Sequence, residues 1–412
     1  MRALVYGLAR SGLAVVERLA ERGDEAVAVD RSLGNEDDPS LLEGVDVLVK
    51  SPGVPGEAPL VRAARERGVQ VWSEVEFAWR LLPDGTRLIG VTGTNGKTTT
   101  AELLGAIFRA AGREVAVAGN VGTPLSSVRD AEWVVCELSS FQLEDVETLR
   151  PRVAVLTNLE PDHLDRHGSF EAYADAKLRI FVRQGPGDVA VVPRGFGPVP
   201  GAARRIEFSA ADALPAEPRI PGTHNRENAA AATAAALAIG VPDEAVARAL
   251  ERFPGVEHRI EEVGAVGGVL YVNDSKATNA AAAIRALASF PGRRKHVILG
   301  GRGKDEPYAA LADALAPGDR AYLIGEATPP LAAALADAGV PYVVSETLER
   351  AVADAAGAAS ASEVVLLSPA CASFDQFESF EHRGEEFRRL VQKLPGWGTE
   401  DVRTGARSSS DC

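Results

Sequence analysis

Apolar residues along this chain fall into short runs that end in polar or glycine-rich turns. Between these runs, apolar positions recur at the three- and four-residue spacing of helices. The predicted strands are Arg2–Tyr6, Ala26–Asp30, Val45–Val49, Val69–Trp72, Arg87–Val91, Val115–Ala118, Trp133–Cys136, Val153–Thr157, Val269–Asn273, His296–Leu299, Arg320–Ile324, Tyr342–Val344 and Val364–Leu367. The predicted helices include Leu13–Glu21, Leu60–Arg67, Glu74–Leu82, Lys97–Ala111 and Asn225–Ile239. Strands that alternate with helices are typical of parallel, doubly wound α/β sheets.

Turn-forming residues divide this pattern into three α/β segments. Pro83-Asp84-Gly85 marks a boundary, so we expect domains over residues 1–83, 84–254 and 255–397. The expected fold class is α/β with three domains: a Rossmann-like N-terminal domain, a central P-loop ATPase-like parallel sheet and a Rossmann-like C-terminal domain. The stretch Arg194–Pro221 is rich in proline and glycine and is expected to be irregular, and residues 398–412 are expected to form a disordered tail.

Composition narrows the possible partners. The chain has 412 residues and a formal net charge of -14, the wrong sign for a nonspecific nucleic-acid binder. Its apolar runs are too short to span a bilayer. Three widely separated cysteines form neither a disulfide framework nor a zinc motif, which indicates a reducing compartment. We therefore expect a cytoplasmic monomer that binds small molecules, with no nucleic acid and no membrane insertion.

Lysine is scarce, and this makes each remaining lysine informative. There are 7 lysines, which leaves 44 - 7 = 37 arginines. Arginine thus fills most positions where any cation serves, so a retained lysine is a candidate for a site that needs a primary amine. Four of the seven, Lys97, Lys177, Lys276 and Lys304, lie in the polar motifs described next.

The strongest motif lies between a predicted strand and a predicted helix. Its residues are Gly93, Thr94, Asn95, Gly96, Lys97, Thr98 and Thr99. Glycines allow backbone N–H groups to surround phosphate oxygens, the lysine reaches the outer phosphates, and the first threonine can bind Mg²⁺. Only two residues separate the glycines, so this is a shortened P-loop. We prefer phosphate binding to an ordinary strand–turn–helix junction.

A weaker glycine motif, Gly7-Leu8-Ala9-Arg10-Ser11-Gly12, follows the first strand. It is a variant of the dinucleotide fingerprint, and Asp30 at the end of the second strand could hold a ribose hydroxyl. The alternative is a tight turn without a ligand. The motif favours a nucleotide or its diphosphate but does not say which nucleotide.

Three further candidates surround the P-loop in the sequence. Glu137 follows a buried strand, the position of a metal ligand in P-loop folds. His163 lies in an acidic turn after another strand and is a candidate ligand, whereas His167 is expected at the surface. Lys177 is followed by apolar residues, and the sequence alone favours a lysine that extends from a half-buried helix to solvent.

Other polar positions carry weaker predictions. Asn225 is expected to cap the alanine-rich helix, and Asn228 lies on the same helix face, where two amides could read a purine edge. Gly300–Asp305 is either an anion-binding loop or merely flexible. Cys371 lacks an evident activating base and is expected to be a buried small residue.

Taken together, these motifs resemble the Mur ligase family of ATP-dependent amide-forming enzymes, over about Arg2 to Val391. The runs Asn273–Asn279 and Ser368–Phe377 are similar to those of the members that add D-glutamate to UDP-N-acetylmuramoyl-L-alanine. That resemblance implies ATP and Mg²⁺ as cofactors and a role in making the peptidoglycan precursor. Phe374 departs from the expected leucine, and the Arg194–Pro221 loop is short.

The resemblance also assigns roles to matching positions. Lys97, His163 and Lys177 would be catalytic. ATP would bind the Gly93–Thr99 motif and Asn225, Asn228, Arg259, Asp274 and Lys276. The UDP-substrate would contact Arg10, Ser11, Asp30, Arg31, Ser51, Gly53 and Asn120. Glutamate would contact Thr278, Lys304, Ser373 and Phe380. The metal ligands would be Thr98, Glu137, His163 and Lys177, the last as its carbamate.

Three other functions remain open. A sibling ligase would use another acceptor, such as L-glutamate or folate with glutamate. A dinucleotide-dependent oxidoreductase would leave the P-loop without a role, and a P-loop motor or switch would hydrolyse ATP without an acceptor. The handedness of a glutamate substrate depends on pocket geometry, which the sequence does not show.

Overall fold

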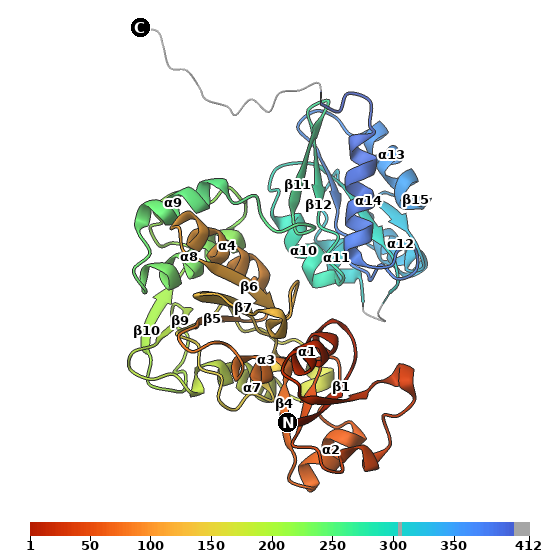
Figure 1. Cartoon of the computed structure of the whole chain (residues 1–412). Coiled ribbons are helices and arrows are strands. Elements are labelled where there is room, and N and C mark those ends of the chain that lie inside the picture. Colours follow the sequence, from red (N-terminus) through yellow and green to blue (C-terminus); the bar gives the residue numbers. More distant parts are fainter. Residues whose placement is uncertain (304–306, 399–412) are drawn as a thin grey trace. The chain divides into compact units, whose positions relative to one another are not determined.

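The computed structural model describes residues 1–303 and 307–398. By its internal contacts the chain forms two compact units, Met1–Phe253 and Pro254–Cys412. The first unit contains two β-sheets and the second contains one (Figure 1). The three sheets confirm the α/β class. In the described part of the chain, every helix is too short or too polar to cross a membrane.

The first sheet has four parallel strands in the order β2-β1-β3-β4. They are β1 (Arg2–Tyr6), β2 (Glu25–Val29), β3 (Val47–Lys50) and β4 (Gln70–Ser73), with helices α1 (Arg10–Glu21), α2 (Pro59–Glu66) and α3 (Glu74–Trp79). Tyr6 pairs with both Val29 and Lys50, so β1, β2 and β3 end level with one another. The residues that follow these strands therefore meet at one edge.

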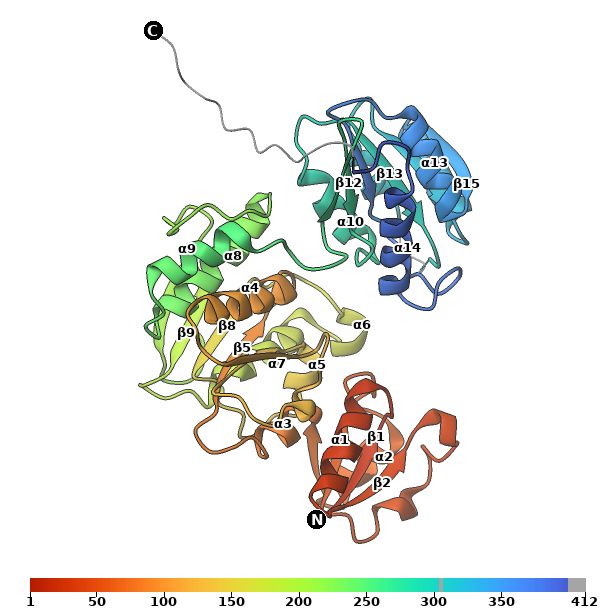
Figure 2. The same cartoon turned by 45° about the horizontal axis from the view of Figure 1, so that its top comes forward.

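The second sheet has six parallel strands in the order β10-β9-β8-β5-β7-β6. They are β5 (Arg87–Thr92), β6 (Val115–Gly119), β7 (Trp133–Glu137), β8 (Val153–Leu156), β9 (Val189–Pro193) and β10 (Arg204–Phe208). Its helices are α4 (Lys97–Ala110), α5 (Ser140–Leu143), α6 (Leu164–His167), α7 (Phe170–Val182), α8 (Thr223–Leu237) and α9 (Asp243–Arg252). Helices α4, α8 and α9 cover one face, and α7 lies on the other (Figures 1 and 2).

Strand β5 lies between β7 and β8, so the connections leave it in opposite directions. In open α/β sheets, ligands bind beyond the carboxyl ends of the strands at such a switch point. The prediction that Arg194–Pro221 is irregular was wrong in part, because β10 pairs with β9 along its whole length. Strand β10 lies at the edge of the sheet and buries only Phe208, so its apolar pattern in the sequence is weak.

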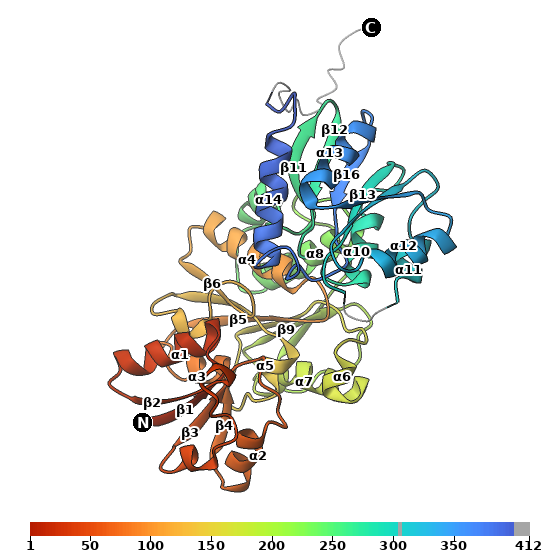
Figure 3. The same cartoon turned by 90° about the vertical axis from the view of Figure 1, so that its right-hand side faces the viewer.

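The third sheet has the order β11-β12-β16-β13-β14-β15. Its strands are β11 (Glu261–Val266), β12 (Val269–Asn273), β13 (Lys295–Gly300), β14 (Arg320–Ile324), β15 (Tyr342–Glu346) and β16 (Val364–Leu367). Only β11, which the sequence analysis did not predict, runs antiparallel to its neighbour. Helices α10 (Ala280–Ala288), α11 (Ala309–Asp313) and α12 (Thr328–Asp337) cover one face, and α13 (Leu348–Ala358) and α14 (Phe380–Gln392) cover the other (Figure 3).

Candidate functional site

The glycine-rich loop after β5 depends on its two glycines. Gly93 has φ +145° and Gly96 has φ +79°, a region that L side chains rarely adopt. A Cβ at Gly93 would lie 2.0 Å from Thr157 Oγ1, and one at Gly96 would lie 2.1 Å from Asn228 Oδ1. Lys97, the first residue of α4, donates from Nζ to the carbonyls of Gly93 at 3.0 Å and Thr94 at 2.9 Å. The loop is therefore compact, and the Lys97 ammonium binds its backbone carbonyls.

The turn after β8 holds this loop in place. Asn158 receives a hydrogen bond from the Asn95 N–H at Oδ1 (2.8 Å), and its amide donates back to the Asn95 carbonyl (3.1 Å). The Thr94 N–H donates to the Asn158 carbonyl, and the Thr94 hydroxyl donates to the Glu160 carbonyl at 3.0 Å. Asn158 and Glu160 therefore shape the loop, a structural role that the sequence analysis did not assign to them.

Lys177 lies at the centre of the site, and the prediction that it extends to solvent was wrong. Its side chain is 2% exposed, and Nζ donates to the Gly93 carbonyl at 2.7 Å. The ammonium also lies 4.7 Å from the centre of the Tyr173 ring. Burial, followed by the nearby cation of Lys97, lowers the pKa of Lys177 from 10.5 to about 7. A substantial fraction of this amine is therefore neutral at physiological pH.

Glu137 and Asn120 come together on the other side of β5. Glu137 ends β7 and pairs in register with Val91, two residues before Gly93. The Asn120 amide donates to Glu137 Oε1 at 3.1 Å, so a predicted substrate contact touches a predicted metal ligand. Thr98 is buried in the first turn of α4. Parallel pairing of β5 and β7 thus brings the two predicted ligands to one edge of the sheet.

Glu137 and Thr98 are the kind of ligands that bind Mg²⁺ together with substrate phosphates, and they do not form a complete metal site by themselves. Among the described residues there is no group of three or more His, Cys, Asp or Glu side chains arranged to hold a metal. Mg²⁺ usually retains waters and binds through one or two carboxylates together with substrate phosphates. One carboxylate and one hydroxyl beside a phosphate-binding loop match that requirement.

His163 lies on the turn before α6 and has φ +51°, in the left-handed region. Its ring is half exposed, with Phe141 at 4.9 Å between ring centres. His167 was predicted at the surface, and that prediction was wrong: its ring is 4% exposed and contacts Ser140 Oγ at 3.0 Å. Burial lowers the pKa of His167. His167, and not His163, is therefore the buried histidine of this turn, because α6 directs the His167 side chain inward.

The first sheet places its candidates at one edge as well. The Leu8 N–H donates to Asp30 Oδ2 at 2.7 Å, and Ser32 donates to Asp30 Oδ1 from its backbone and hydroxyl. These hydrogen bonds lower the pKa of Asp30. The Ser51 hydroxyl donates to the Gly7 carbonyl at 2.6 Å. Asp30 and Ser51 thus brace the glycine loop that contains Arg10 and Ser11.

Arg10 also connects this loop to the second sheet. Its Nη1 donates at 3.2 Å to the carbonyl of Gly122, in the loop that contains Asn120. Arg31 and Gly53 lie at the same edge of the first sheet, after β2 and β3. The residues predicted to bind one substrate therefore extend from the first sheet to the edge of the second.

The two asparagines of α8 have different positions. Gly222 is the N-cap of α8, so the prediction that Asn225 caps this helix was wrong. Asn225 lies in the first turn and donates from Nδ2 to the Pro221 carbonyl at 2.6 Å. Asn228, one turn further, is buried against Gly96. The fold thus brings Asn228 to the phosphate loop, 132 positions away in the sequence (228 - 96).

In the second unit, the ends of β12 and β16 bring two long motifs together. Asp274 receives the Ser368 hydroxyl at 2.7 Å and the Ile260 N–H at 3.2 Å. Burial raises the pKa of Asp274 from 3.8 to about 7, while Ser368 and then the nearby cation of Arg259 oppose the shift. Lys276 Nζ lies 5.8 Å from the centre of the Phe380 ring.

The other candidates of the second unit follow the same edge. Thr278 lies between β12 and α10, and Ser373 is buried after β16. Phe374 is 62% exposed, so its departure from the expected leucine does not disturb the core. Cys371 is fully buried, with its Sγ 3.2 Å from the Tyr308 hydroxyl, which confirms the prediction of a buried small residue. Lys304 lies outside the described residues, as do residues 399–412 of the predicted tail.

Arg383 organises this edge, and the sequence analysis did not single it out as a site residue. Its side chain is fully buried and donates to the Ser275 hydroxyl (3.0 Å) and carbonyl (2.9 Å) and to the Cys371 carbonyl (3.1 Å). A further bond of 3.4 Å reaches the Gly300 carbonyl. The available signal was its spacing, because Arg383 shares a helix face with Phe387 and Leu390.

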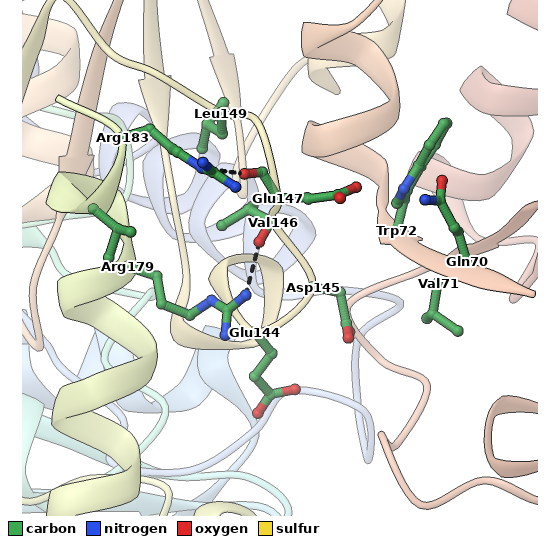
Figure 4. A pocket seen from close by; sticks show the side chains of 11 residues that line it. Gln70, Val71, Trp72, Glu144, Asp145, Val146, Glu147, Leu149, Arg179 and Arg183 are labelled. Atoms are coloured by element: carbon green, nitrogen blue, oxygen red, sulfur yellow. Dashed lines mark hydrogen bonds between the residues drawn. The ribbon is translucent and has the colours of Figure 1, made fainter. Parts of the chain in front are cut away.

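A cavity of about 450 Å³ lies in the first unit, beside the free edge of β4. Figure 4 shows Trp72 and Gln70 from β4 on one side, and Arg179 of α7 and Arg183, directly after α7, on the other. Asp145 and its neighbours form the wall between them. None of the candidate residues above lines this cavity. We therefore assign the site to the carboxyl ends of the parallel strands.

Comparisons with known proteins show the family to which the chain belongs. The Mur ligase middle domain model matches residues 91–195, and the Mur ligase glutamate ligase domain model matches residues 258–371. A UDP-N-acetylmuramoylalanine--D-glutamate ligase from Anaeromyxobacter dehalogenans is 43% identical, covering 95% of this chain and 97% of the relative. The enzyme of the same description from Acidobacterium capsulatum is 41% identical, covering 95% and 96%.

Solved structures show the same fold at lower identity. The UDP-N-acetylmuramate-alanine ligase MurC from Thermotoga maritima has a TM-score of 0.62 and 19% identity, covering 95% of this chain and 99% of that protein. A bifunctional folylpolyglutamate synthase/dihydrofolate synthase from Yersinia pestis, complexed with AMPPNP and Mn, has a TM-score of 0.56 and 20% identity, covering 77% and 92%. With relatives above 40% identity over nearly its full length, the chain belongs to the Mur ligase family.

Proposed function

We propose that this protein is an ATP-dependent ligase that joins D-glutamate to the L-alanyl carboxylate of UDP-N-acetylmuramoyl-L-alanine. The single observation that carries the proposal is the full-length similarity to relatives described as UDP-N-acetylmuramoylalanine--D-glutamate ligases. The P-loop with Lys97 supports the use of a nucleoside triphosphate. The product is a precursor of peptidoglycan.

ATP is proposed to place its phosphates on the Gly93–Thr99 loop. Lys97 would turn from the loop carbonyls to the outer phosphates, and the N-terminus of α4 would add its positive dipole. The proposed ATP contacts outside the loop are Asn225, Asn228, Arg259, Asp274 and Lys276. Asn228 has the strongest support, since its amide already lies against Gly96.

Mg²⁺ is proposed at two positions, held by Thr98 and Glu137 and by His163 and Lys177. When bound, the ions would neutralise phosphate charge during transfer. The buried amine of Lys177 supports its role as a carbamate, since only a neutral amine adds to CO₂ and its pKa is about 7. Arginine could not form that carbamate. The AMPPNP and Mn of the Yersinia pestis complex support a metal–nucleotide site in this fold.

The reaction is proposed to follow two displacements. The L-alanyl carboxylate oxygen attacks the γ-phosphorus of ATP, ADP leaves, and an acyl phosphate forms. The neutral amine of glutamate then attacks the acyl carbon, phosphate leaves, and the amine loses a proton as the amide forms. Positioning and charge neutralisation carry most of the phosphoryl transfer. In this chain Lys97 stabilises the transferred group, while Asn120 and Arg10 orient the UDP-substrate.

Substrate contacts divide between the two units. Arg10, Ser11, Asp30, Arg31, Ser51, Gly53 and Asn120 are proposed to hold the UDP-substrate. Asp30 already accepts hydrogen bonds from Leu8 and Ser32 within its loop, so it supports that role through the shape of the loop. Thr278, Lys304, Ser373 and Phe380 are proposed to hold glutamate. We place the reaction in the cytoplasm, since that is where ATP and the UDP-sugar meet, and we propose that the protein acts as a monomer.

The test is phosphate release from ATP with UDP-N-acetylmuramoyl-L-alanine and either D-glutamate, L-glutamate or no amino acid. We expect release only when the UDP-sugar and D-glutamate are both present. A preference for L-glutamate would keep the mechanism and change the acceptor. Release that is indifferent to both substrates would refute the proposal and favour a P-loop ATPase.

A further inference from the structure

The inference rests on the proposed function and concerns α6, the four-residue helix that follows His163. The residues from Asn158 to His163 belong to no helix or strand, and α6 is only four residues long. Side-chain contacts must therefore set the position of His163. Before His163, Glu160 contacts Thr94 and Asn95 of the P-loop. After His163, the side-chain contacts of α6 lead to the loop after β3 in the first sheet, which contains Ser51 and Gly53.

Arg166 of α6 makes these contacts. Its Nη1 donates to the Pro52 carbonyl at 3.2 Å, and its Nη2 donates to the Val54 carbonyl at 2.9 Å. The guanidinium also stacks 4.2 Å from the centre of the Phe141 ring, the same ring that His163 contacts. The side chain is 18% exposed, so these hydrogen bonds are partly shielded from water. One residue thus touches the Ser51–Gly53 loop and the aromatic support of His163.

Two acidic residues after α5, Glu144 and Asp145, form ion pairs with the side chains around Arg166. Glu144 lies 3.7 Å from Arg166 Nη2, 3.3 Å from His167 Nδ1 and 3.6 Å from Lys50 Nζ. The carboxylate of Asp145 lies 2.9 Å from the fully buried ammonium of Lys50, and also pairs with Arg65 at 2.9 Å. The cluster therefore joins the first sheet, α5 and α6 in one partly buried ion network.

Lys50 closes the connection. It is the last residue of β3, directly before the Ser51–Gly53 loop, and its Nζ also donates to the Val54 carbonyl at 3.3 Å. The Val54 carbonyl thus receives both Lys50 and Arg166. A displacement of this loop would move Arg166, and Arg166 would move α6 and His163.

We infer that Arg166 is a positioning residue that couples the UDP-substrate loop to the second metal position. Binding of the UDP-sugar against Ser51–Gly53 fixes the two carbonyls that Arg166 contacts. Arg166 then fixes α6, and His163 is held at the edge of the phosphate site. Occupancy of one site thereby favours occupancy of the other, and the coupling is reciprocal.

The test compares Arg166→Ala with wild type and with Arg183→Ala. Arg183 is an exposed arginine of the same unit that donates to a single carbonyl, Glu147, so it is a matched loss of charge and of one hydrogen bond. Phosphate release is measured against free Mg²⁺ at fixed ATP, once at low and once at saturating UDP-N-acetylmuramoyl-L-alanine. The ratio of the two half-saturating Mg²⁺ concentrations is the coupling.

Wild type and Arg183→Ala are expected to show a coupling of at least about fivefold, and Arg166→Ala a ratio near one. The KM for the UDP-sugar rises in Arg166→Ala, while the KM for ATP at saturating Mg²⁺ changes little. Arg166→Lys keeps the charge opposite Glu144 but cannot bind both carbonyls, so its coupling is intermediate. This variant keeps the test decisive if Arg166→Ala is thermally unstable.

Two results would overturn the inference. Arg166→Ala could keep the wild-type coupling, or Arg183→Ala could lose as much coupling as Arg166→Ala. Both results require active wild-type protein, so they are distinct from failure of the proposed function. Wild type without phosphate release that depends on the UDP-sugar and D-glutamate would refute the proposed function, and this inference with it.

Discussion

Lys177 offers the sharpest test of the site, through the pH dependence of folding stability. The change is Lys177→Met, which keeps most of the side-chain volume and removes the buried amine. In the folded protein, burial and the Lys97 cation lower the pKa of Lys177 from 10.5 to about 7. In the unfolded chain the amine is in water and titrates near its ordinary value. Folding therefore changes the proton affinity of this one group.

The sign and size of the effect follow from that difference. Between about pH 7 and pH 10.5 the unfolded chain binds more protons than the folded protein, so stability rises with pH. The slope approaches about 1.4 kcal/mol per pH unit, and the whole shift corresponds to about 5 kcal/mol. Below about pH 7 both states carry the proton and the full cost of the buried cation is present. The methionine variant has no such slope.

The assay is guanidinium unfolding of wild type and Lys177→Met at about pH 7.5 and about pH 9.5, in buffer free of CO₂. Tryptophan fluorescence follows mainly the first unit, because Trp72, Trp79 and Trp133 lie there. The stability difference, wild type minus variant, should rise by about 2 to 3 kcal/mol over this interval. The lost hydrogen bond to Gly93 shifts both values equally and leaves the slope unchanged.

Lys393→Met, at an exposed position, is the control and should keep the wild-type slope. Equal slopes for wild type and Lys177→Met would refute the depressed pKa. Bicarbonate provides a second comparison at fixed pH. If CO₂ adds to the neutral amine, it stabilises folded wild type by mass action and leaves Lys177→Met unchanged. Stabilisation of both proteins alike would exclude a carbamate on Lys177.

Three further changes test other parts of the site. Lys97→Ala should lower kcat by at least ~10²-fold, since it removes one preorganised charge from the transferred phosphoryl group; steady-state kinetics measures this, and near-normal turnover would contradict the role. Gly96→Ala should weaken ATP binding, measured by calorimetry, because its Cβ would lie 2.1 Å from Asn228 Oδ1 in a backbone with φ +79°. Adding Asn228→Gly should not restore binding, because the backbone strain at position 96 remains and Asn228 is itself a proposed ATP contact. Arg383→Met should lower the stability of the second unit by at least ~3 kcal/mol, because four backbone carbonyls each lose one donor and, among the described residues, only that of Ala372 is seen to keep another, the Arg302 N–H. Trp397 fluorescence in guanidinium measures this loss, and an unchanged midpoint would contradict the role.

Much of the fold could be predicted from the sequence because apolar strands of parallel sheets are buried on both faces and form continuous runs. Strand β5 and the loop after it show this, as the predicted range Arg87–Val91 differs from the observed β5 by one residue. Strands β9, β10 and β11 were not predicted. β10 and β11 lie at sheet edges and each has a single buried position, so neither contains a continuous apolar run. β9 is such a run, Val189–Pro193, which the sequence analysis did not include.

The candidate site shows the same division. Motifs that are contiguous in sequence, such as Gly93–Thr99, carry their chemistry in adjacent residues, and their backbone conformation follows from glycine. Sequence spacing gave no sign that Asn228 lies against Gly96 or that Arg166 contacts the loop after β3. These contacts join residues more than 100 positions apart, and no local preference specifies them.

The sequence by itself thus determined the α/β class, most of the strands and the phosphate loop, because each depends on local periodicity or on backbone freedom at glycine. Only the tertiary structure decided the electrostatic state of the site. Lys177 reads as a surface lysine in sequence, yet packing of α7 beneath the loop buries its amine beside Lys97 and the Gly93 carbonyl. A pKa depends on the water and charges around a group, and the fold alone determines both.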